Sequence, residues 1–116
     1  MSILEEKSYT YSIRIIMCSE YLQQEKKEFI LSKQFLRSGA AMEVLVAESN
    51  YAQSKLDFIN KLSISLKEAN ETKSWLRLLK DRNYLQEKLA LSLLDDIEKL
   101  IRILAPSIKN SKRKQP

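Results

Sequence analysis

The order of hydrophobic and polar residues divides the chain into four amphipathic segments. In each segment apolar residues recur at steps of three or four, which is the period of an α-helix. The pattern predicts helices over residues 3–24, 29–50 and 54–80, and a fourth that follows a turn at 81–84 and ends by Ala105. The breaks between them are short, as in bundles whose successive helices are antiparallel. We therefore predict an all-α fold, an antiparallel up-down-up-down four-helix bundle.

The predicted core consists of apolar residues that share one face of each helix, where another helix can cover them. Phe58 and Trp75 lie beside the face of the third helix, and we expect them at the core or at an interface. The predicted core residues are Ile13, Ile16, Met17 and Tyr21 in the first helix, Leu31, Phe35, Met42 and Val46 in the second, Ile59, Leu62, Leu66, Ala69, Leu76 and Leu79 in the third, and Leu89, Leu93, Ile97, Leu100, Leu104 and Ile108 in the fourth.

Polar residues mark the predicted helix starts. Ser2 is followed three residues later by Glu5, and Ser54 by Asp57. In this spacing the hydroxyl and the carboxylate can each accept a free backbone amide of the first turn. Proline has no amide hydrogen to continue a helix, so Pro106 predicts fraying or a kink in the last turn.

The second helix contains a run of small residues, Gly39-Ala40-Ala41. Small side chains let the backbone of another helix come close. We therefore predict that Gly39 serves helix packing and does not contact a ligand.

The composition excludes several classes of site. One glycine and two prolines in 116 residues give no material for a glycine-rich phosphate loop, and the chain has no histidine and a single cysteine. The commonest general base and metal ligand are therefore missing, and neither a disulfide nor a thiolate cluster can form within one chain. No apolar run approaches the roughly 20 residues of a membrane-spanning helix, and no signal peptide is evident. We expect a cytoplasmic protein.

Three remaining chemistries have little support. Glu68 and Glu71 share a helical face, but the usual carboxylate-bridged metal site in a bundle also needs histidine. Serine and lysine are plentiful, yet no spacing singles out a Ser-Lys pair. Cys18 lies within the first amphipathic helix, where a half-buried thiol is usually inert. We expect no catalytic residue, no metal and no cofactor, and hence a protein that is not an enzyme.

The net charge of +5 is concentrated at the end of the chain. Four basic residues, Lys109, Lys112, Arg113 and Lys114, lie in the last eight positions, which leaves +1 for residues 1–108. Residues 61–108 are nevertheless more basic than residues 1–60. We divide the chain into one bundle domain, 1–108, and a basic flexible tail, 109–116. Such a tail attracts phosphate polymers without reading sequence, or it only increases solubility.

A series of short motifs in the second and third helices carries a family resemblance. The motifs are Phe35-Leu36-Arg37-Ser38-Gly39, Ala47-Glu48, Ala52-Gln53-Ser54-Lys55-x-Asp57-Phe58-Ile59-x-Lys61-Leu62, Leu66-Lys67-Glu68-Ala69-x-Glu71-Thr72 and Trp75-Leu76-Arg77-Leu78-Leu79. In this order they resemble the bacterial four-helix-bundle proteins encoded within intervening sequences of 23S ribosomal RNA genes. The match is densest over residues 31–85 and extends more loosely from Lys7 to Ile108.

The resemblance implies a ring-like homopentamer. It also implies kinship with the accessory proteins of diversity-generating retroelements, which bind nucleic acid and a reverse transcriptase, so a reverse transcriptase is one possible protein partner. No catalytic residues come with it, and Leu45 stands where the family often has an asparagine. Six matching charged residues are candidates for contacts between helices or between subunits, with Glu48 and Glu71 expected beside Arg37 or Arg77. They are Arg37, Glu48, Lys55, Asp57, Glu68 and Glu71.

Two functional hypotheses remain. The first is a non-enzymatic homo-oligomer that binds RNA or DNA weakly and nonspecifically through positive charge. The second is a protein-interaction adaptor or structural assembly protein with no nucleic-acid role, whose exposed apolar residues are subunit contacts. The candidate nucleic-acid-binding residues are Lys67, Lys73, Arg77, Lys80 and Arg82 in and after the third helix, and Lys109, Lys112, Arg113 and Lys114 in the tail.

Overall fold

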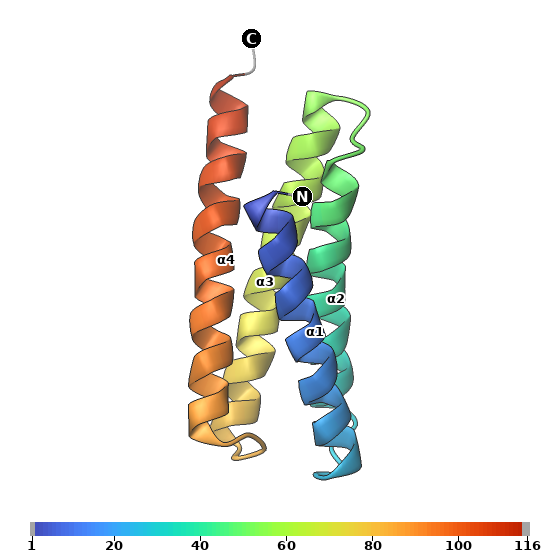
Figure 1. Ribbon diagram of the computed structural model, residues 1–116, viewed down its shortest axis with the longest axis vertical. Coiled ribbons are helices and arrows are strands. Elements are labelled where there is room, and N and C mark those ends of the chain that lie inside the picture. Colours follow the sequence, from blue (N-terminus) through green and yellow to red (C-terminus); the bar gives the residue numbers. More distant parts are fainter. Residues whose placement is uncertain (1, 115–116) are drawn as a thin grey trace.

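Four long helices follow the predicted segments. The computed structural model describes residues 2–114 and contains α1 (Ile3–Gln24), α2 (Leu31–Ser49), α3 (Lys55–Asp81) and α4 (Glu87–Arg113). The first three agree with the predicted boundaries to within two residues at each end. The helices lie side by side in an elongated bundle of 51 × 22 × 20 Å, and α1 begins about half-way along α4 (Figure 1). The predicted all-α four-helix bundle is confirmed.

Both predicted helix starts are capped by their own side chains. The Ser2 hydroxyl accepts the backbone amide of Glu5 at 3.1 Å, and the Glu5 carboxylate accepts the backbone amide of Ser2. The Ser54 hydroxyl accepts the amide of Asp57 at 3.0 Å. The Asp57 carboxylate, however, accepts the amide of Gln53, one residue before the cap, at 3.2 Å. These bonds satisfy amides that lack a partner in the first turn of a helix.

The start of α2 is capped by a residue that the sequence analysis did not identify. Glu28 is buried, and its carboxylate accepts the backbone amides of Ile30, Leu31 and Ser32 at 3.2, 3.0 and 2.7 Å. Its negative charge also lies at the positive end of the helix dipole. This arrangement explains why α2 begins at Leu31 and not at Phe29. The preceding turn passes through Lys27, whose φ of 54° is left-handed.

The end of α3 is a Schellman motif. Asn83 adopts a left-handed backbone with φ of 65°. The amides of Asn83 and Tyr84 donate to the carbonyls of Lys80 and Leu79, both at 3.0 Å. These bonds satisfy carbonyls in the last turn, and asparagine is one of the few residues that tolerates the left-handed position. The chain therefore reverses within a few residues and enters α4.

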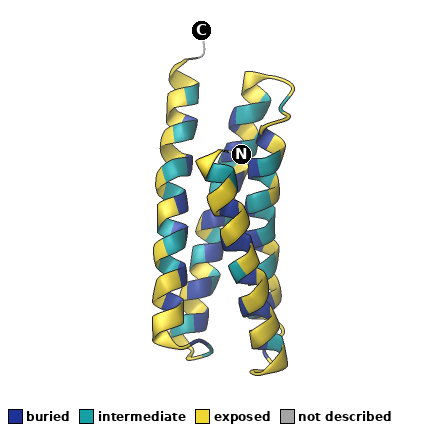
Figure 2. Cartoon of the chain, viewed as in Figure 1, coloured by how far each residue is buried: buried dark blue, intermediate teal, exposed yellow. Residues whose placement is uncertain are grey.

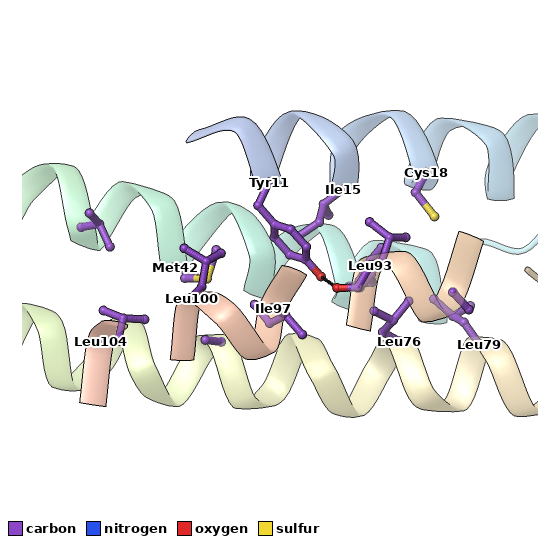
Figure 3. Close-up of a cluster of buried hydrophobic side chains, with 14 of the residues drawn as sticks. Tyr11, Ile15, Cys18, Met42, Leu76, Leu79, Leu93, Ile97, Leu100 and Leu104 are labelled. Atoms are coloured by element: carbon purple, nitrogen blue, oxygen red, sulfur yellow. Dashed lines mark hydrogen bonds between the residues drawn. The ribbon is translucent and has the colours of Figure 1, made fainter. Parts of the chain in front are cut away.

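The prediction for the buried face of α1 is wrong. Ile13, Ile16, Met17 and Tyr21 are exposed, and Met17 retains 65% of its accessible surface. The opposite face enters the core and includes Tyr11, Ile15, Cys18 and Leu22 (Figures 2 and 3). Both sides of α1 carry apolar residues at helical spacing, so periodicity alone could not select between them.

The predicted core of the other helices is largely correct. Leu31 and Leu66 are partly buried against the core, as are Phe58 and Trp75. Leu89 is an exception because it is exposed, and Ala90 takes its place inside. The remaining predicted core residues are buried, namely Phe35, Met42, Val46, Ile59, Leu62, Ala69, Leu76, Leu79, Leu93, Ile97, Leu100, Leu104 and Ile108.

Gly39 brings α1 and α2 close together. A β-carbon placed on Gly39 would lie 2.4 Å from Cδ1 of Ile15, which is fully buried. A β-carbon at this position would therefore force the Ile15 side chain to move. The small residue serves packing, as predicted.

Polar groups also fix how the helices meet. The Tyr11 hydroxyl donates to the carbonyl of Leu93 at 2.8 Å, which ties α1 to α4 (Figure 3). The Thr72 hydroxyl donates to Ser38 Oγ at 2.8 Å, and the Ser65 hydroxyl donates to the carbonyl of Met42 at 2.8 Å. Because these buried groups have partners, they add specificity to the core without leaving a desolvated polar atom unpaired.

The prediction that α4 ends by Ala105 is wrong, because the helix passes through Pro106 and continues to Arg113. Ile108 is buried, and the Ser107 hydroxyl donates to the carbonyl of Ile103 at 2.7 Å. Once a helix is nucleated and packed, further residues extend it at low cost, and the basic residues of the last turn favour the negative end of the helix dipole. The proposed tail boundary at residue 109 therefore falls inside α4. Residues 115–116 lie outside the described part of the chain.

Candidate nucleic-acid interface

Charge is unevenly distributed between the two halves of the bundle. Residues 1–54, which include α1 and α2, carry six Lys and Arg against seven Asp and Glu. Residues 55–116, which include α3 and α4, carry fourteen against eight. The positive charge of the protein therefore belongs to the second helical hairpin, and it is not confined to the end of the chain.

Three of the candidate basic residues meet in a groove between α3 and α4. Lys73, Arg77 and Lys80 follow one another at steps of four and three along α3, so they share one face. The groove has a volume of about 460 Å³. Its other lining residues are Leu91, Leu94 and Glu98 from α4 and Asp81 from the end of α3.

Part of this positive charge is neutralised inside the groove. Lys73 forms an ion pair with Glu98, and Lys80 forms one with the adjacent Asp81 at 3.3 Å. The adjacent Lys73 ammonium, reinforced by the nearby charge of Arg102, holds the pKa of the Glu98 carboxyl below its ordinary value. Arg77 is exposed and forms no ion pair within residues 2–114. It is therefore the cation of the groove that is free to bind an added anion.

The other basic candidates lie elsewhere. Lys67 is exposed, but its position along α3 turns it away from the face of Lys73 and Lys80. Arg82 is the C-terminal cap of α3 and lies in the turn. Lys109, Lys112 and Arg113 are exposed on the last turns of α4, and Lys114 caps that helix. Glu98 and Lys109 are separated by eleven residues, or about 16 Å of helix. The groove and the last turns of α4 are therefore two basic regions, and the exposed Arg102 lies between them on α4.

A second polar cluster joins α2 to α3. The Arg37 guanidinium forms ion pairs with Glu71 and, at 3.3 Å, with Glu68. Glu71 also accepts the indole N–H of Trp75 at 3.3 Å. The Glu68 Oε2 atom is buried and receives no hydrogen bond, so its partner is the charge of Arg37. Because the carboxylates already hold the guanidinium, this cluster is a contact between helices and not a vacant anion site.

The remaining charged candidates differ in their contacts. The prediction that Glu48 lies beside Arg37 or Arg77 is wrong. Glu48 of α2 faces Lys61 of α3, with 3.6 Å between the carboxylate oxygen and the ammonium nitrogen. Asp57 reaches Gln53 just before its own helix and caps α3. Lys55, the first residue of α3, is exposed.

Other places that could hold a ligand offer less. A cleft of about 270 Å³ between α1 and α4 carries charges of both signs, from Glu6, Lys7, Asp96 and Lys99. Burial raises the pKa of the Cys18 thiol to about 11, so the reactive thiolate is disfavoured. Within residues 2–114 no three carboxylate or thiol groups come together as a metal site. No helix in this part of the chain has the length and apolar character needed to cross a bilayer.

The basic residues of the groove could be predicted from the sequence, but the residues of α4 that line its opposite side could not. Leu91 is half exposed on α4, and Glu98 forms the ion pair that limits the charge of Lys73. Lys73, Arg77 and Lys80 are spaced by four and three residues, and this spacing is enough to predict that they share one face of α3. The helix α4 begins fourteen residues after Lys73. No pattern in the sequence around Lys73 shows which residues of α4 will face it.

The comparisons with known proteins agree with the fold. The comparison with curated proteins found no match. A crystal structure from Bacteroides thetaiotaomicron VPI-5482, described as a protein of unknown function from the S23 ribosomal protein family, is 41% identical to the chain with a TM-score of 0.91. The match covers 92% of this chain and 99% of that one. The family model described as 23S rRNA-intervening sequence protein matches residues 2–106, and the chain therefore belongs to this family.

Proposed function

We propose that the protein is a non-enzymatic homo-oligomer that binds RNA or DNA weakly and without sequence specificity. The observation that carries the proposal is the charge distribution, with an excess of six positive charges on residues 55–116. Nucleic-acid binding of this kind depends on neutralising phosphates and does not need base-specific contacts.

Two regions supply the phosphate contacts. Among residues 2–114 no carboxylate pairs with Arg77, and the last turns of α4 present Lys109, Lys112 and Arg113 to solvent. Lys73 and Lys80 contribute less because each already faces a carboxylate. A phosphate polymer bridges both regions more readily than a single phosphate ion, because its charges are spaced along a backbone.

Assembly strengthens such weak contacts. A pentamer, the state that the family resemblance implies, would carry a formal charge of +25, five times the +5 of one chain. Linked sites on one particle bind a long polyanion with higher apparent affinity than isolated sites do. Homo-oligomerisation is thus the means by which a modest charge per chain produces useful binding.

The test is fluorescence anisotropy of labelled single-stranded RNA and duplex DNA across a salt series. We compare the unmodified protein with Arg77→Glu and with the double variant Lys112→Glu/Arg113→Glu. Lys33→Glu, on the exposed side of α2, is the charge-matched control for the single variant. We expect lower affinity and a shallower salt dependence for the first two, since each lost phosphate contact reduces the slope by about 0.9 on duplex DNA. Absence of binding at low salt would refute nucleic-acid binding.

A specific observation favours the second candidate, a protein-interaction adaptor with no nucleic-acid role. The outer side of α1 exposes apolar residues, including Ile13 and Met17, that a protein partner could cover. Under this alternative the protein stays unbound in the anisotropy assay, and affinity capture recovers a protein partner that resists nuclease treatment. A reverse transcriptase is one class of partner that the resemblance suggests.

A further inference from the structure

A stripe of basic residues runs along α4 from the groove to the end of the helix. From Glu98 in the groove, steps of four, seven and four residues lead to Arg102, Lys109 and Arg113, so these residues share one side of the helix. All three cations are exposed. The stretch from Glu98 to Arg113 spans fifteen residues, or about 22 Å of helix. Figure 1 shows this part of α4 running toward the end of the bundle at which α3 begins.

The stripe is free of competing carboxylates. After Glu98 the chain contains six basic residues and no acidic residue. Arg102 lies near Glu98, but Glu98 pairs with Lys73, and Arg102 forms no ion pair within residues 2–114. The neighbouring side of the antiparallel helix α3 is uncharged over this length. It continues from Lys73 as Asn70, Leu66 and Ser63.

Arg77 extends the stripe at its groove end. Lys73 meets Glu98 across the groove, and Arg77 lies one turn further from the end of α4, which adds about 6 Å. Four cations without an ion pair within residues 2–114 thus form a row about 28 Å long beside the boundary of α3 and α4. We call this row the α4 track, and its members are Arg77, Arg102, Lys109 and Arg113.

We infer that the α4 track binds a single strand of nucleic acid lengthwise, with Arg102 as the contact that joins the groove to the last turns of α4. The inference rests on the proposed function and names the form of the nucleic acid and a further contact residue. Charge complementarity selects a polyanion as the occupant. A flexible single strand can place a phosphate against each cation of a nearly straight row.

A duplex fits the track less well because its phosphates follow a helical path. One turn of B-DNA takes about 34 Å, and a straight line along its surface crosses each of the two strands once per turn. A track of about 28 Å therefore meets about two backbone crossings. A single strand, at about 3.4 Å per stacked nucleotide, sets about eight phosphates along the same length. A strand can thus engage all four cations, and a duplex about half of them.

The test is fluorescence anisotropy of the full chain across a salt series, with a labelled DNA strand of about eight nucleotides and with the same sequence as a duplex kept below its melting temperature. A strand of this length spans one track. The test variant is Arg102→Glu, and Arg102→Lys keeps the charge. Lys33→Glu, on the exposed side of α2, is the charge-matched control.

We expect the strand to bind more tightly than the duplex. The slope of log affinity against log salt for the strand should be about −2.8, which is about −0.7 for each of four contacts. Arg102→Glu should weaken strand binding about fivefold or more and make the slope shallower by about 0.7. Arg102→Lys and Lys33→Glu should leave the affinity and the slope nearly unchanged.

The other results count against the inference in distinct ways. A duplex that binds as tightly as the strand overturns the single strand as the occupant. A folded Arg102→Glu variant with the affinity of the unmodified chain overturns the continuous track. In both cases polyanion binding stands, whereas absence of binding to either DNA at low salt overturns the proposed function as well.

Two further controls complete the experiment. A peptide of about eight glutamates, matched in charge to the strand, should not displace it at equal concentration, and equal competition would overturn nucleic acid as the occupant. Far-UV circular dichroism establishes that each variant is folded. Should Arg102→Glu fail to fold, Arg102→Gln removes the positive charge without adding a negative one and gives the same comparison.

Discussion

The contact between Gly39 and Ile15 makes a quantitative prediction about helix packing. In Gly39→Ala the new β-carbon would lie 2.4 Å from Cδ1 and 3.1 Å from Cγ2 of Ile15. Ile15 is fully buried and cannot turn into solvent. Overpacking of this kind costs roughly 1–3 kcal/mol, whereas alanine is favoured over glycine within a helix by about 0.5–1 kcal/mol. We expect the free energy of unfolding to fall, by up to about 2.5 kcal/mol.

A second substitution isolates the contact. Ile15→Val removes Cδ1, the atom that the new methyl group would meet, and costs about 0.5–1.5 kcal/mol by itself. In the double variant the alanine methyl occupies the space that Cδ1 leaves. The double variant should therefore be more stable than the sum of the single effects predicts, by about 1–2 kcal/mol, within the range measured for directly contacting residues.

The assay is guanidinium-induced unfolding followed by circular dichroism and by the fluorescence of Trp75, the one tryptophan of the chain. It is run at two protein concentrations, because the midpoint of an oligomer depends on concentration. Additivity within about 0.5 kcal/mol, or a Gly39→Ala variant more stable than the unmodified protein, would refute the close approach of α1 and α2.

Three further predictions concern the caps and the buried thiol. Glu28→Ala should lower the free energy of unfolding by about 1–2 kcal/mol, because the backbone amides at the start of α2 lose their acceptor. The stability of Glu28→Gln should lie between those of Glu28→Ala and the unmodified protein. Guanidinium-induced unfolding measures both variants. Lys27→Gly should raise the free energy of unfolding by up to about 1 kcal/mol, because glycine tolerates the left-handed backbone of this residue. Lys26→Gly should not raise the free energy of unfolding, because Lys26 has no left-handed backbone to relieve. Burial raises the pKa of the Cys18 thiol from 9.0 to about 11 in the folded protein. The contribution of the protonated thiol to the free energy of unfolding should therefore be fully present below pH 9 and be lost as the pH rises through 11. In Cys18→Ala the same thermal unfolding series should show a smaller fall.

The sequence by itself determined much of the local structure. The boundaries of α1, the caps at Ser2 and Ser54 and the packing role of Gly39 follow from short-range chemistry. A helix has a fixed period, and its free end groups need partners within a few residues, so both leave a pattern that can be recognised in the chain. The absence of histidine likewise limits the possible chemistry from the sequence alone.

Only the tertiary structure decided which face of α1 is buried, where α4 ends and which residues of α4 face the basic residues of α3. Tyr11 and its acceptor Leu93 are 82 residues apart, as are Arg14 and Asp96. With apolar residues on both sides of α1, the choice of face depended on these distant partners. Pro106 stayed within a helix because Leu104 and Ile108 are held in the core on either side of it. Such outcomes depend on packing between segments that are remote in sequence, and local periodicity carries no record of them.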